Sequence, residues 1–386
     1  MSPSTPAAVI VLAAGQGTRM KSTKPKVLHA IGGRSLVGHA VAAGRGLDPE
    51  HLVVVVRHER EQVAEHVSAL DPAALIADQD EIPGTGRAVQ CALETLDAAA
   101  QGRAAARRDE REPLEGAATH ALAGAVVVLA GDVPLLDTET LAALLDAHTA
   151  DGNAVTVLTT LVQDPTGYGR IVRAPGTGDV VEIVEQKDAD AEQLAINEIN
   201  SSVYVFDAAV LRSGLARVGR DNAQGEVYLT DVLALAREAG GSVRALIAQD
   251  SLLVEGVNDR SQLATLGAEL NRRIVTDWML EGVTVLDPAS TWVDVDVELA
   301  PDVTLLPGTQ LLGHTHVGTG ATIGPDTTLK DVQVGEHATV VRTHGSDSQI
   351  GDHATVGPFA YLRPGTVLGA RGKIGTFVET KNAEIG

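Results

Sequence analysis

A glycine-rich loop near the start of the chain carries the residue types best suited to binding phosphate. It directly follows an apolar run, and Gly15 and Gly17 precede several cationic side chains, among them Arg19, Lys24 and Lys26. Glycines let backbone N–H groups approach phosphate oxygens closely, and the cations neutralise phosphate charge. The spacing matches neither the dinucleotide-binding nor the P-loop signature. A glycine turn with solvated lysines is the alternative reading, but the position after a first strand and the three cations favour a phosphate site.

A second candidate is a carboxylate in the segment VVVLAGDVPLL, residues 126–136. Asp132 comes just after an apolar run, beside a glycine and before Pro134. In open α/β sheets, ligands bind outside the carboxyl ends of the strands. One carboxylate there suits Mg²⁺, which takes few protein ligands and completes its octahedron with water and phosphate. Taken alone, the motif is equally typical of a turn or helix-capping aspartate.

The elements that must position these motifs alternate between Val-rich and Ala/Leu-rich segments. Continuous apolar runs are typical of strands covered on both faces, so we expect an α/β fold with a mostly parallel sheet. The expected strands are 7–14, 51–57, 74–78, 125–132 and 154–162. The expected helices are 35–44, 59–70, 86–100 and 138–150, the last with Asp137 as its N-cap.

Two further stretches depart from this alternation. Residues 101–124 mix four basic and four acidic residues with Ala and Gly and lack an apolar period, which predicts a solvated surface insertion without an assigned function. Residues 259–281 place apolar side chains at three- and four-residue steps, which predicts one long helix connecting two domains. The stripe consists of Leu263, Leu266, Leu270, Ile274 and Trp278.

After this helix the apolar period becomes six, which fits neither a helix nor an ordinary strand. The first run is Val293, Leu299, Leu305, Leu311, Val317, Ile323 and Leu329; after a slip come Ile350, Val356, Leu362, Leu368 and Ile374. A second register of mostly small residues holds Val297, Val303, Thr309, Thr315, Ala321 and Thr327. Such repeats build a parallel β-helix. The chain stops at Gly386 inside the repeat, without a capping element, as a fragment would.

Composition excludes several classes of partner. Of the 386 residues, 30 are Lys or Arg and 51 are Asp or Glu, giving a net charge of -21. Nucleic acids and anionic membranes require a basic surface, so we expect neither as a partner. One cysteine, Cys91, excludes a disulfide framework, and no apolar run is long enough to span a membrane. We expect a soluble, cytoplasmic protein.

The motifs LAAGQGTRMKSTKPKVL, GTG and GDVPLL, in this order, resemble nucleotide-sugar pyrophosphorylases. The chain is most similar to the bacterial bifunctional N-acetylglucosamine-1-phosphate uridyltransferase/glucosamine-1-phosphate acetyltransferases, from about Val9 to Gly386. The resemblance implies a Rossmann-like nucleotidyltransferase domain over 1–257, a linker helix over 258–282, and a left-handed β-helix of hexapeptide repeats over 283–386 that forms part of an acetyltransferase domain.

The resemblance also implies roles for individual residues. Those implied to bind the nucleotide or the UDP-sugar are Leu12, Ala13, Ala14, Gly15, Lys26, Gln79, Gly84, Thr85, Gly169, Glu185, Asn200 and Asn258. Gln79, Gly84 and Thr85 read uracil, whose edge of two carbonyls and one N–H suits an amide and backbone groups. Asp132 and Asn258 hold Mg²⁺, and Arg19 and Lys26 are catalytic.

The implied reaction transfers UMP from UTP to N-acetylglucosamine 1-phosphate, giving UDP-N-acetylglucosamine and pyrophosphate for cell-wall precursor synthesis. The β-helix of the family uses acetyl-CoA to acetylate glucosamine 1-phosphate and forms a homotrimer. Arg363 and Lys381 match its sugar-phosphate-binding segments. The family's catalytic histidine and most CoA-binding loops lie beyond Gly386, so this chain alone is expected to lack acetyltransferase activity. His344 and His353 are interpreted as exposed turn residues, not as a general base.

Three positions depart from the family pattern. Arg87 replaces the usual His after the GTG motif, Pro83 replaces a common Leu, and Ser202 stands where Gly is frequent. None of these changes removes an implied ligand. Two alternatives stay open: a nucleotidyltransferase for ADP- or dTDP-sugars with a structural β-helix, and a non-catalytic subunit with a degenerate transferase domain.

Overall fold

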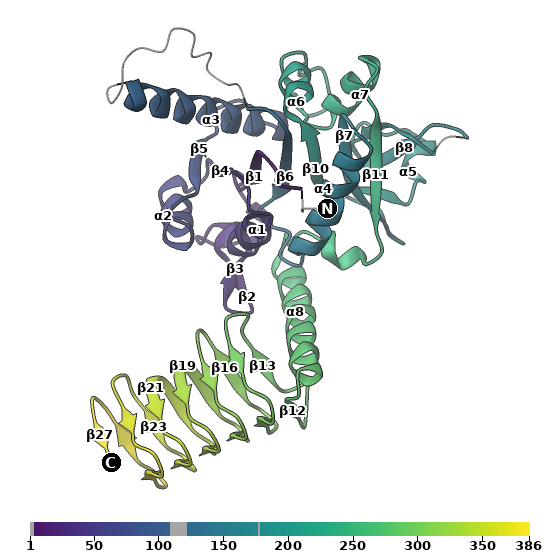
Figure 1. The fold of residues 1–386 in the computed structure, drawn as a ribbon. Coiled ribbons are helices and arrows are strands. Elements are labelled where there is room, and N and C mark those ends of the chain that lie inside the picture. Colours follow the sequence, from purple (N-terminus) through teal and green to yellow (C-terminus); the bar gives the residue numbers. More distant parts are fainter. Residues whose placement is uncertain (1–3, 109–121, 177) are drawn as a thin grey trace. The chain divides into compact units, whose positions relative to one another are not determined.

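The computed structural model describes residues 4–108, 122–176 and 178–386 (Figure 1). The chain divides into two compact units. The first unit is Met1–His29 with Ser35–Gln262, and the second is Ala30–Arg34 with Leu263–Gly386. In the part of the chain that is described, no helix is both long and apolar enough to cross a membrane.

The first unit is built on a nine-stranded mixed sheet in which seven strands run in the order β11-β7-β10-β6-β1-β4-β5. Their bounds are β1 Ala8–Leu12, β4 His51–Val56, β5 Leu75–Asp78, β6 Ala125–Ala130, β7 Val155–Leu161, β10 Glu198–Asp207 and β11 Val243–Ala248. All five predicted strands are present. The sheet is mostly parallel as expected, but β10 runs antiparallel to both β6 and β7. The strands β8 (Arg170–Arg173) and β9 (Val180–Val184) form an antiparallel pair beside β10.

Helices cover both faces of this sheet because its central strands are apolar on both sides. Along β1, Ala8 and Ile10 pack with α3, α6 and α7, whereas Val9 and Val11 pack with α1, α2 and α4. The helices are α1 Leu36–Arg45, α2 Arg60–Leu70, α3 Thr85–Arg108, α4 Thr138–Ala150, α5 Ala191–Leu194, α6 Ala208–Leu215 and α7 Asp231–Glu238. Short 3₁₀ turns cover Thr18–Met20, Lys26–Leu28 and Ser251–Val254.

The predicted helix ends agree with the structure at α4 and differ at α3. Asp137 caps α4 as expected, its carboxylate accepting a 2.7 Å hydrogen bond from Thr140 N. Helix α3 continues to Arg108, so the first eight residues of the predicted 101–124 insertion are helical. Alanine and arginine favour helix even without an apolar period, which explains the extension. Residues 109–121 of that insertion lie outside the described residues.

The second unit contains most of the long helix α8 (Arg260–Leu280), confirming the helix predicted over 259–281. Its buried face includes Leu266, Asn271 and Val275. Asn271 joins the helix to the first coil: its amide donates to Thr291 O at 2.8 Å, and its carbonyl oxygen accepts from Val293 N at 2.9 Å. A short hairpin, β2 (Ala30–Ile31) with β3 (Arg34–Ser35), places its residues 30–34 in this unit.

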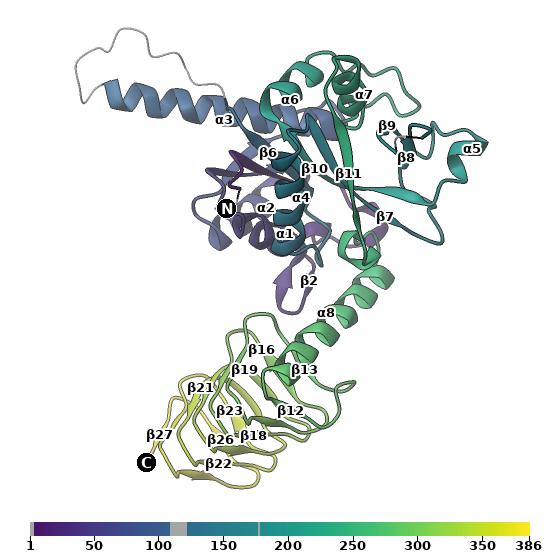
Figure 2. The same ribbon diagram turned by 45° about the vertical axis from the view of Figure 1, so that its right-hand side comes forward.

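The rest of the second unit is a parallel β-helix, whose stacked coils are visible in Figure 2. Its strands are β12 Thr284–Val285, β13 Trp292–Val293, β14 Glu298–Leu299, β15 Thr304–Leu305, β16 Gln310–Leu312, β17 His316–Val317, β18 Thr322–Ile323, β19 Thr328–Val334, β20 Thr339–Val340, β21 His344–Ile350, β22 Thr355–Val356, β23 Tyr361–Leu362, β24 Val367–Leu368, β25 Lys373–Ile374, β26 Glu379–Thr380 and β27 Glu384–Ile385. The pairings between coils are parallel, and every predicted period-six position is buried.

The slip in the repeat corresponds to shortened coils. Val293 pairs with Leu311, eighteen residues later, but Leu329 pairs with Gly345 after only sixteen. At the shortened corners the strands continue without interruption, so that β19 and β21 each have seven residues. The coils therefore stay paired with one another, although the shortened coils have fewer turn residues.

Candidate active site

Four side chains predicted to act on the nucleotide meet beside the ends of β1 and β6 in the first unit. Lys26 Nζ donates to Asp132 Oδ2, and Arg19 Nη2 donates to Asn258 Oδ1 at 2.8 Å. The two pairs are held together because Val257 N donates to Asp132 O at 2.9 Å. We call Arg19, Lys26, Asp132 and Asn258 the strand-end cluster. Residues that lie 106 and 239 positions apart in the sequence are thus brought into contact.

The glycine-rich loop is fixed by the strands on either side of β1. Ala13 N donates to Val55 O on β4, and Gly131 N, just after β6, donates to Leu12 O, both at 2.9 Å. At Gly17 the backbone has φ +64°, and a Cβ there would overlap the Lys26 side chain. Glycine at this position therefore lets the lysine stem lie against the loop and reach Asp132. Apart from its two chain neighbours, no described residue has an atom within 4 Å of the position that a Cβ at Gly15 would take, so the loop is open there.

Asp132 and Asn258 fit a magnesium site of the type that phosphate substrates complete. Asp132 is partly buried, with its side chain 21% exposed, and offers one carboxylate oxygen beyond the one bound to Lys26. That oxygen, Oδ1, faces Gly256, whose Cβ position is 3.7 Å away, so no side chain at 256 blocks it. Within the described residues, no cluster of three or more His, Cys, Asp or Glu side chains offers an alternative metal site. A single carboxylate and one amide oxygen are compatible with Mg²⁺, which keeps most of its ligands as water and phosphate.

The segment predicted to read uracil forms a tight loop between β5 and α3. Gln79 Nε2 donates to Ile82 O at 3.0 Å and to Gly84 O at 3.2 Å. Gly84 has φ +117°, and a Cβ there would collide with the backbone of Val227. Thr85 Oγ1 accepts from Leu229 N at 3.2 Å. The loop is therefore held both by its own glutamine and by the segment that precedes α7.

The three residues predicted to bind the amino sugar lie together. Asn200 N donates to Gly169 O at 2.9 Å, and the Cβ position of Gly169 is 3.5 Å from Glu185 Oε1. Asn200 Nδ2 donates to the hydroxyl of Tyr204 at 2.7 Å, which fixes the asparagine side chain. Burial raises the pKa of Glu185, and three nearby carboxylates, Asp188, Asp231 and Glu226, raise it further.

The backbone at Ser202 shows why glycine is frequent at this position in the family. It lies in a bulge of β10, between Asn200 and Tyr204, where the register with β7 shifts. Its φ is +63°, in the left-handed region that favours glycine. Asn200 Oδ1 accepts a 3.1 Å hydrogen bond from Ser202 N, so the bulge helps to orient the asparagine.

Tyr168 lies next to the predicted sugar site, and the sequence alone did not single it out. Burial raises the pKa of its phenol, and the negative charges of Glu255 and Asp132 raise it further. It precedes Gly169 directly, and Gly169 lies beside Asn200 and Glu185 at the predicted sugar site. The GYGRIVR motif contained this signal, because an aromatic residue between two glycines in a polar loop is poorly suited to a core.

Comparison with known proteins identifies the family. A model of the MobA-like NTP transferase domain matches residues 9–174. The bifunctional protein GlmU of Kineococcus radiotolerans is 62% identical over 384 residues, covering 100% of this chain and 73% of the relative. That of Paenarthrobacter aurescens is 60% identical over 388 residues, covering 100% of this chain and 74% of the relative. The chain belongs to the GlmU family. Its first unit is therefore a nucleotidyltransferase of UDP-N-acetylglucosamine synthesis, as the sequence predicted.

In the GlmU β-helix, the structure places the two predicted sugar-phosphate residues on successive coils. Tyr361 and Leu362 pair with Glu379 and Thr380, and Arg363 N donates to Thr380 O at 3.0 Å, which sets Arg363 beside Lys381. The Arg363 guanidinium pairs with the Glu379 carboxylate at 2.9 Å.

The two histidines of the repeat that the sequence did not assign to catalysis are both exposed. His353 is in a turn, with φ +58°, and its ring stacks on that of His337. His344 lies instead at the start of β21, beside the ring of Tyr361. A hollow of about 500 Å³ along the coils, bordered by Gly318, Gly335 and Gly351, contains none of the predicted site residues.

Proposed function

We propose that the strand-end cluster is the site at which UMP is transferred from UTP to N-acetylglucosamine 1-phosphate, with release of pyrophosphate. The observation that supports this most directly is the convergence of the four predicted residues, Arg19, Lys26, Asp132 and Asn258, in two bonded pairs. They lie outside the carboxyl ends of β1 and β6, where ligands of α/β sheets bind. The family assignment supports the same reaction.

The reaction needs positioning and charge neutralisation more than a protein nucleophile. A phosphate oxygen of the sugar 1-phosphate is already ionised at neutral pH and attacks the α-phosphorus of UTP in line, breaking its bond to the pyrophosphate oxygen. Arg19 and Lys26 lie on the loop that follows β1 and neutralise the charge of the triphosphate and the departing pyrophosphate. Both cations are bonded to polar partners in the cluster, which holds their side chains in place.

Mg²⁺ is proposed to bind at Asp132 and Asn258. When bound, it supplies positive charge that offsets the negative charge of the phosphates and orients them. Lys26 and Arg19 hold the two side chains, one cation at each. Leu12, Ala13, Ala14 and Gly15 are proposed to border the nucleotide, since the loop passes between β4 and β6 at this point.

The sugar is proposed to bind at Gly169, Glu185 and Asn200. Asn200 uses its amide N–H on Tyr204 and its carbonyl on Ser202 N, so its position is fixed before the ligand arrives. Glycine at 169 leaves room between Asn200 and Glu185. A carboxylate and an amide carbonyl supply acceptors for sugar hydroxyls and for an acetamido N–H.

Pyrophosphate release tests the reaction. With UTP, N-acetylglucosamine 1-phosphate and Mg²⁺, we expect stoichiometric pyrophosphate and UDP-N-acetylglucosamine, and no product after chelation of the metal. Asp132→Ala is expected to abolish turnover, whereas Asp151→Ala, at the exposed C-terminal end of α4, leaves it unchanged. Equal rates with ATP or dTTP would favour a different nucleotidyltransferase, and no release with any nucleotide would favour a non-catalytic subunit.

For the second unit, we propose that Arg363 and Lys381 bind the phosphate of glucosamine 1-phosphate during an acetyl-CoA-dependent reaction. Their neighbouring positions on successive coils support this. We also propose a homotrimer formed through the β-helix; exposed Phe359 and Phe377 stack with ring centroids 5.4 Å apart and offer apolar contact area. Thiol release from acetyl-CoA and sedimentation equilibrium test the two proposals. A cytoplasmic location stays a prediction.

A further inference from the structure

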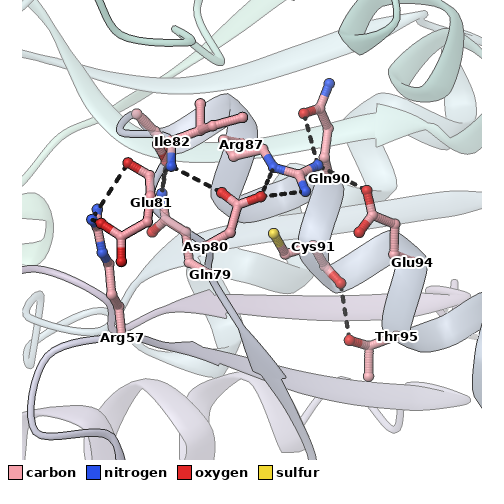
Figure 3. A network of polar contacts seen from close by, with 11 residues as sticks. Arg57, Gln79, Asp80, Glu81, Ile82, Arg87, Gln90, Cys91, Glu94 and Thr95 are labelled. Atoms are coloured by element: carbon pink, nitrogen blue, oxygen red, sulfur yellow. Dashed lines mark hydrogen bonds and ion pairs between the residues drawn. The ribbon is translucent and has the colours of Figure 1, made fainter.

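A network of charged side chains surrounds the loop predicted to read uracil (Figure 3). Arg87, in the first turn of α3, donates to Asp80 Oδ2 from both Nε and Nη2, at 2.9 and 2.7 Å. Its remaining nitrogen, Nη1, donates to Glu94 Oε1 at 2.8 Å and to Gln90 Oε1 at 3.3 Å. The arginine side chain is only 18% exposed, although its partners Asp80 and Glu94 are 42% and 64% exposed. The guanidinium therefore ties the loop to the helix.

The tie reaches Gln79 through Asp80. While Oδ2 of Asp80 binds Arg87, its Oδ1 accepts from Ile82 N at 3.0 Å. This hydrogen bond fixes the turn whose carbonyls, Ile82 O and Gly84 O, accept from Gln79 Nε2. The chain of contacts runs from Arg87 to Asp80, to the Ile82 peptide and then to the glutamine amide.

The orientation of the Gln79 amide follows from these contacts. Its nitrogen donates to two carbonyls, so Oε1 is the atom left to meet a ligand, and within the described residues that oxygen accepts no hydrogen bond. Uracil presents a donor, N3–H, where cytosine presents an unprotonated nitrogen that is an acceptor. An acceptor fixed at Gln79 therefore favours uracil and opposes cytosine, whereas a glutamine free to turn offers either group.

We propose that Arg87 is a positioning residue that sets selectivity for uracil by holding Asp80, and through it the amide orientation of Gln79. This inference rests on the proposed nucleotide site and adds to it the reason why the loop discriminates between bases. A second arginine that contacts the loop, Arg57 just after β4, makes longer contacts with Glu81, at 3.3 and 3.4 Å, and the Glu81 side chain is fully exposed. Arg87 is thus the stronger of the two ties.

Both partners of the Arg87–Asp80 ion pair stay charged at neutral pH, so the pair persists. The Arg87 guanidinium lowers the pKa of Asp80, mainly through their hydrogen bonds, so Asp80 stays ionised at neutral pH. Arginine also stays charged throughout the physiological range, unlike the histidine that is usual at this position in the family.

The first test compares Arg87→Met with Arg60→Met. Methionine keeps most of the side-chain length but removes the guanidinium. Arg60 is the matched control because it also pairs with an aspartate, Asp78, and among the described residues its side chain has no hydrogen bond to the loop 79–84. For Arg87→Met we expect the ratio of dissociation constants for CTP and UTP to fall by about tenfold, with KM for UTP raised and kcat changed by less than about twofold. Arg60→Met should leave all three unchanged.

Binding and turnover are measured separately, by calorimetry and by pyrophosphate release. If the wild-type protein binds UTP but releases no pyrophosphate, the proposed function is contradicted. The ratio of dissociation constants for CTP and UTP can still be measured in that case. An unchanged CTP-to-UTP ratio in Arg87→Met would overturn the role of Arg87. If that variant fails to fold, Asp80→Asn is measured instead. Asparagine keeps the Oδ1 contact with Ile82 but weakens the tie to Arg87, so a smaller loss of selectivity is expected, and none would overturn the proposal.

The second test uses Arg87→His and pH. The groups facing this position are Asp80 on the loop and Glu94 and Cys91 on α3, while Arg57 on the far side faces Asp80. A histidine there pairs with Asp80 only when protonated, and the two carboxylates favour that form. We therefore expect KM for UTP in the variant to rise as pH increases from about 6 to about 8, while the wild-type value stays flat. Parallel profiles for the two proteins would show that the residue at 87 acts only as a structural support.

Discussion

The two units use polar side chains in different ways. In the first unit the proposed active residues are bonded to each other across the fold, and the side chains of the central pair, Lys26 and Asp132, are only 12% and 21% exposed. In the β-helix, Arg363 and Glu379 pair across successive coils, sixteen residues apart, at 38% and 59% exposure. The first arrangement depends on contacts between distant segments, and the second on the stacking of neighbouring repeats.

This difference separates the information that determines fold from the information that determines chemistry. Every coil of the β-helix repeats the same buried positions, so its fold is specified many times over, while its exterior stays free to vary. The strand-end cluster exists once, and its residues come from three separate segments, one after β1, one after β6 and one before α8. Substitutions in the first unit should therefore affect catalysis strongly at little cost in stability, and core substitutions in the second should do the opposite.

The largest expected effect is the loss of turnover in Arg19→Ala. Removing a cation that neutralises phosphate charge should lower kcat on the order of 10³-fold. The side chain is exposed, and among the described residues its one hydrogen bond is to Asn258, so the melting temperature should hardly change. Pyrophosphate-release kinetics and thermal denaturation measure the two effects. Arg217→Ala, which breaks an exposed pair with Glu238, is the control; near-normal turnover in Arg19→Ala would refute the assigned role.

The next effect is on the stability of the second unit. Ile323 is fully buried in the β-helix core, and Ile323→Ala should lower the free energy of unfolding of this unit by about 3 kcal/mol through lost burial and an unfilled cavity. Uridylyltransfer should stay within about twofold of wild type. Hydrogen exchange resolved by segment measures each unit separately. The neighbouring Thr322→Ala, whose side chain is only half-buried, is the control. Equal loss of protection in both units would show that they unfold together.

Regular periodicity made much of both units predictable from sequence. The five continuous apolar runs and the period-six repeat define buried positions directly, and Asp137 marks the start of α4 by its residue type. The grouping of Lys26 and Asp132 was also foreseeable, because the carboxyl ends of neighbouring parallel strands lie at one edge of the sheet. The assignment of individual sugar and base contacts depended on the family resemblance.

Other features depend on contacts that no local pattern encodes. The antiparallel direction of β10 is set by its partners, since an apolar strand reads alike in both directions. The hairpin at residues 30–34 belongs to the second unit because Val295 N donates to Gly32 O and Arg34 pairs with Asp296. Tyr204 was missed because its hydroxyl acquires a role only through the bulge that brings Asn200 to it.

A smaller effect concerns the stability cost of the proposed sugar site. The pKa of Glu185 is raised in the folded protein, so the carboxyl favours folding when protonated and loses that contribution as pH rises through the folded pKa. Glu185→Gln stays neutral and should therefore melt higher than wild type at pH 7, by a few degrees on a scale of about 2–4 °C per kcal/mol. The gain should disappear below about pH 4, where the unfolded glutamate is also protonated.

Melting curves across pH measure this effect, together with KM for the sugar 1-phosphate, which should rise. The matched position in the second unit is Asp294, whose pKa burial also raises. Its carboxylate accepts from Gly313 N at 2.9 Å, so Asp294→Asn tests the same titration away from the proposed sugar site. A pH-independent difference between Glu185→Gln and wild type would show that packing, not ionisation, is responsible.

The smallest expected effect is at Ser202. A non-glycine residue at φ +63° is strained by about 1 kcal/mol, part of which glycine returns through greater freedom of the unfolded chain. Ser202→Gly should therefore raise the free energy of unfolding of the first unit by about 0.5 kcal/mol. Asp302, at φ +64° in a β-helix turn, should gain less on replacement by glycine, because aspartate tolerates this region better. Ser213→Gly, in the exposed face of α6, should lose about 0.5 kcal/mol. Urea midpoints compare the three variants. A lower free energy of unfolding in Ser202→Gly would mean that the serine side chain stabilises the bulge by more than the backbone strain destabilises it.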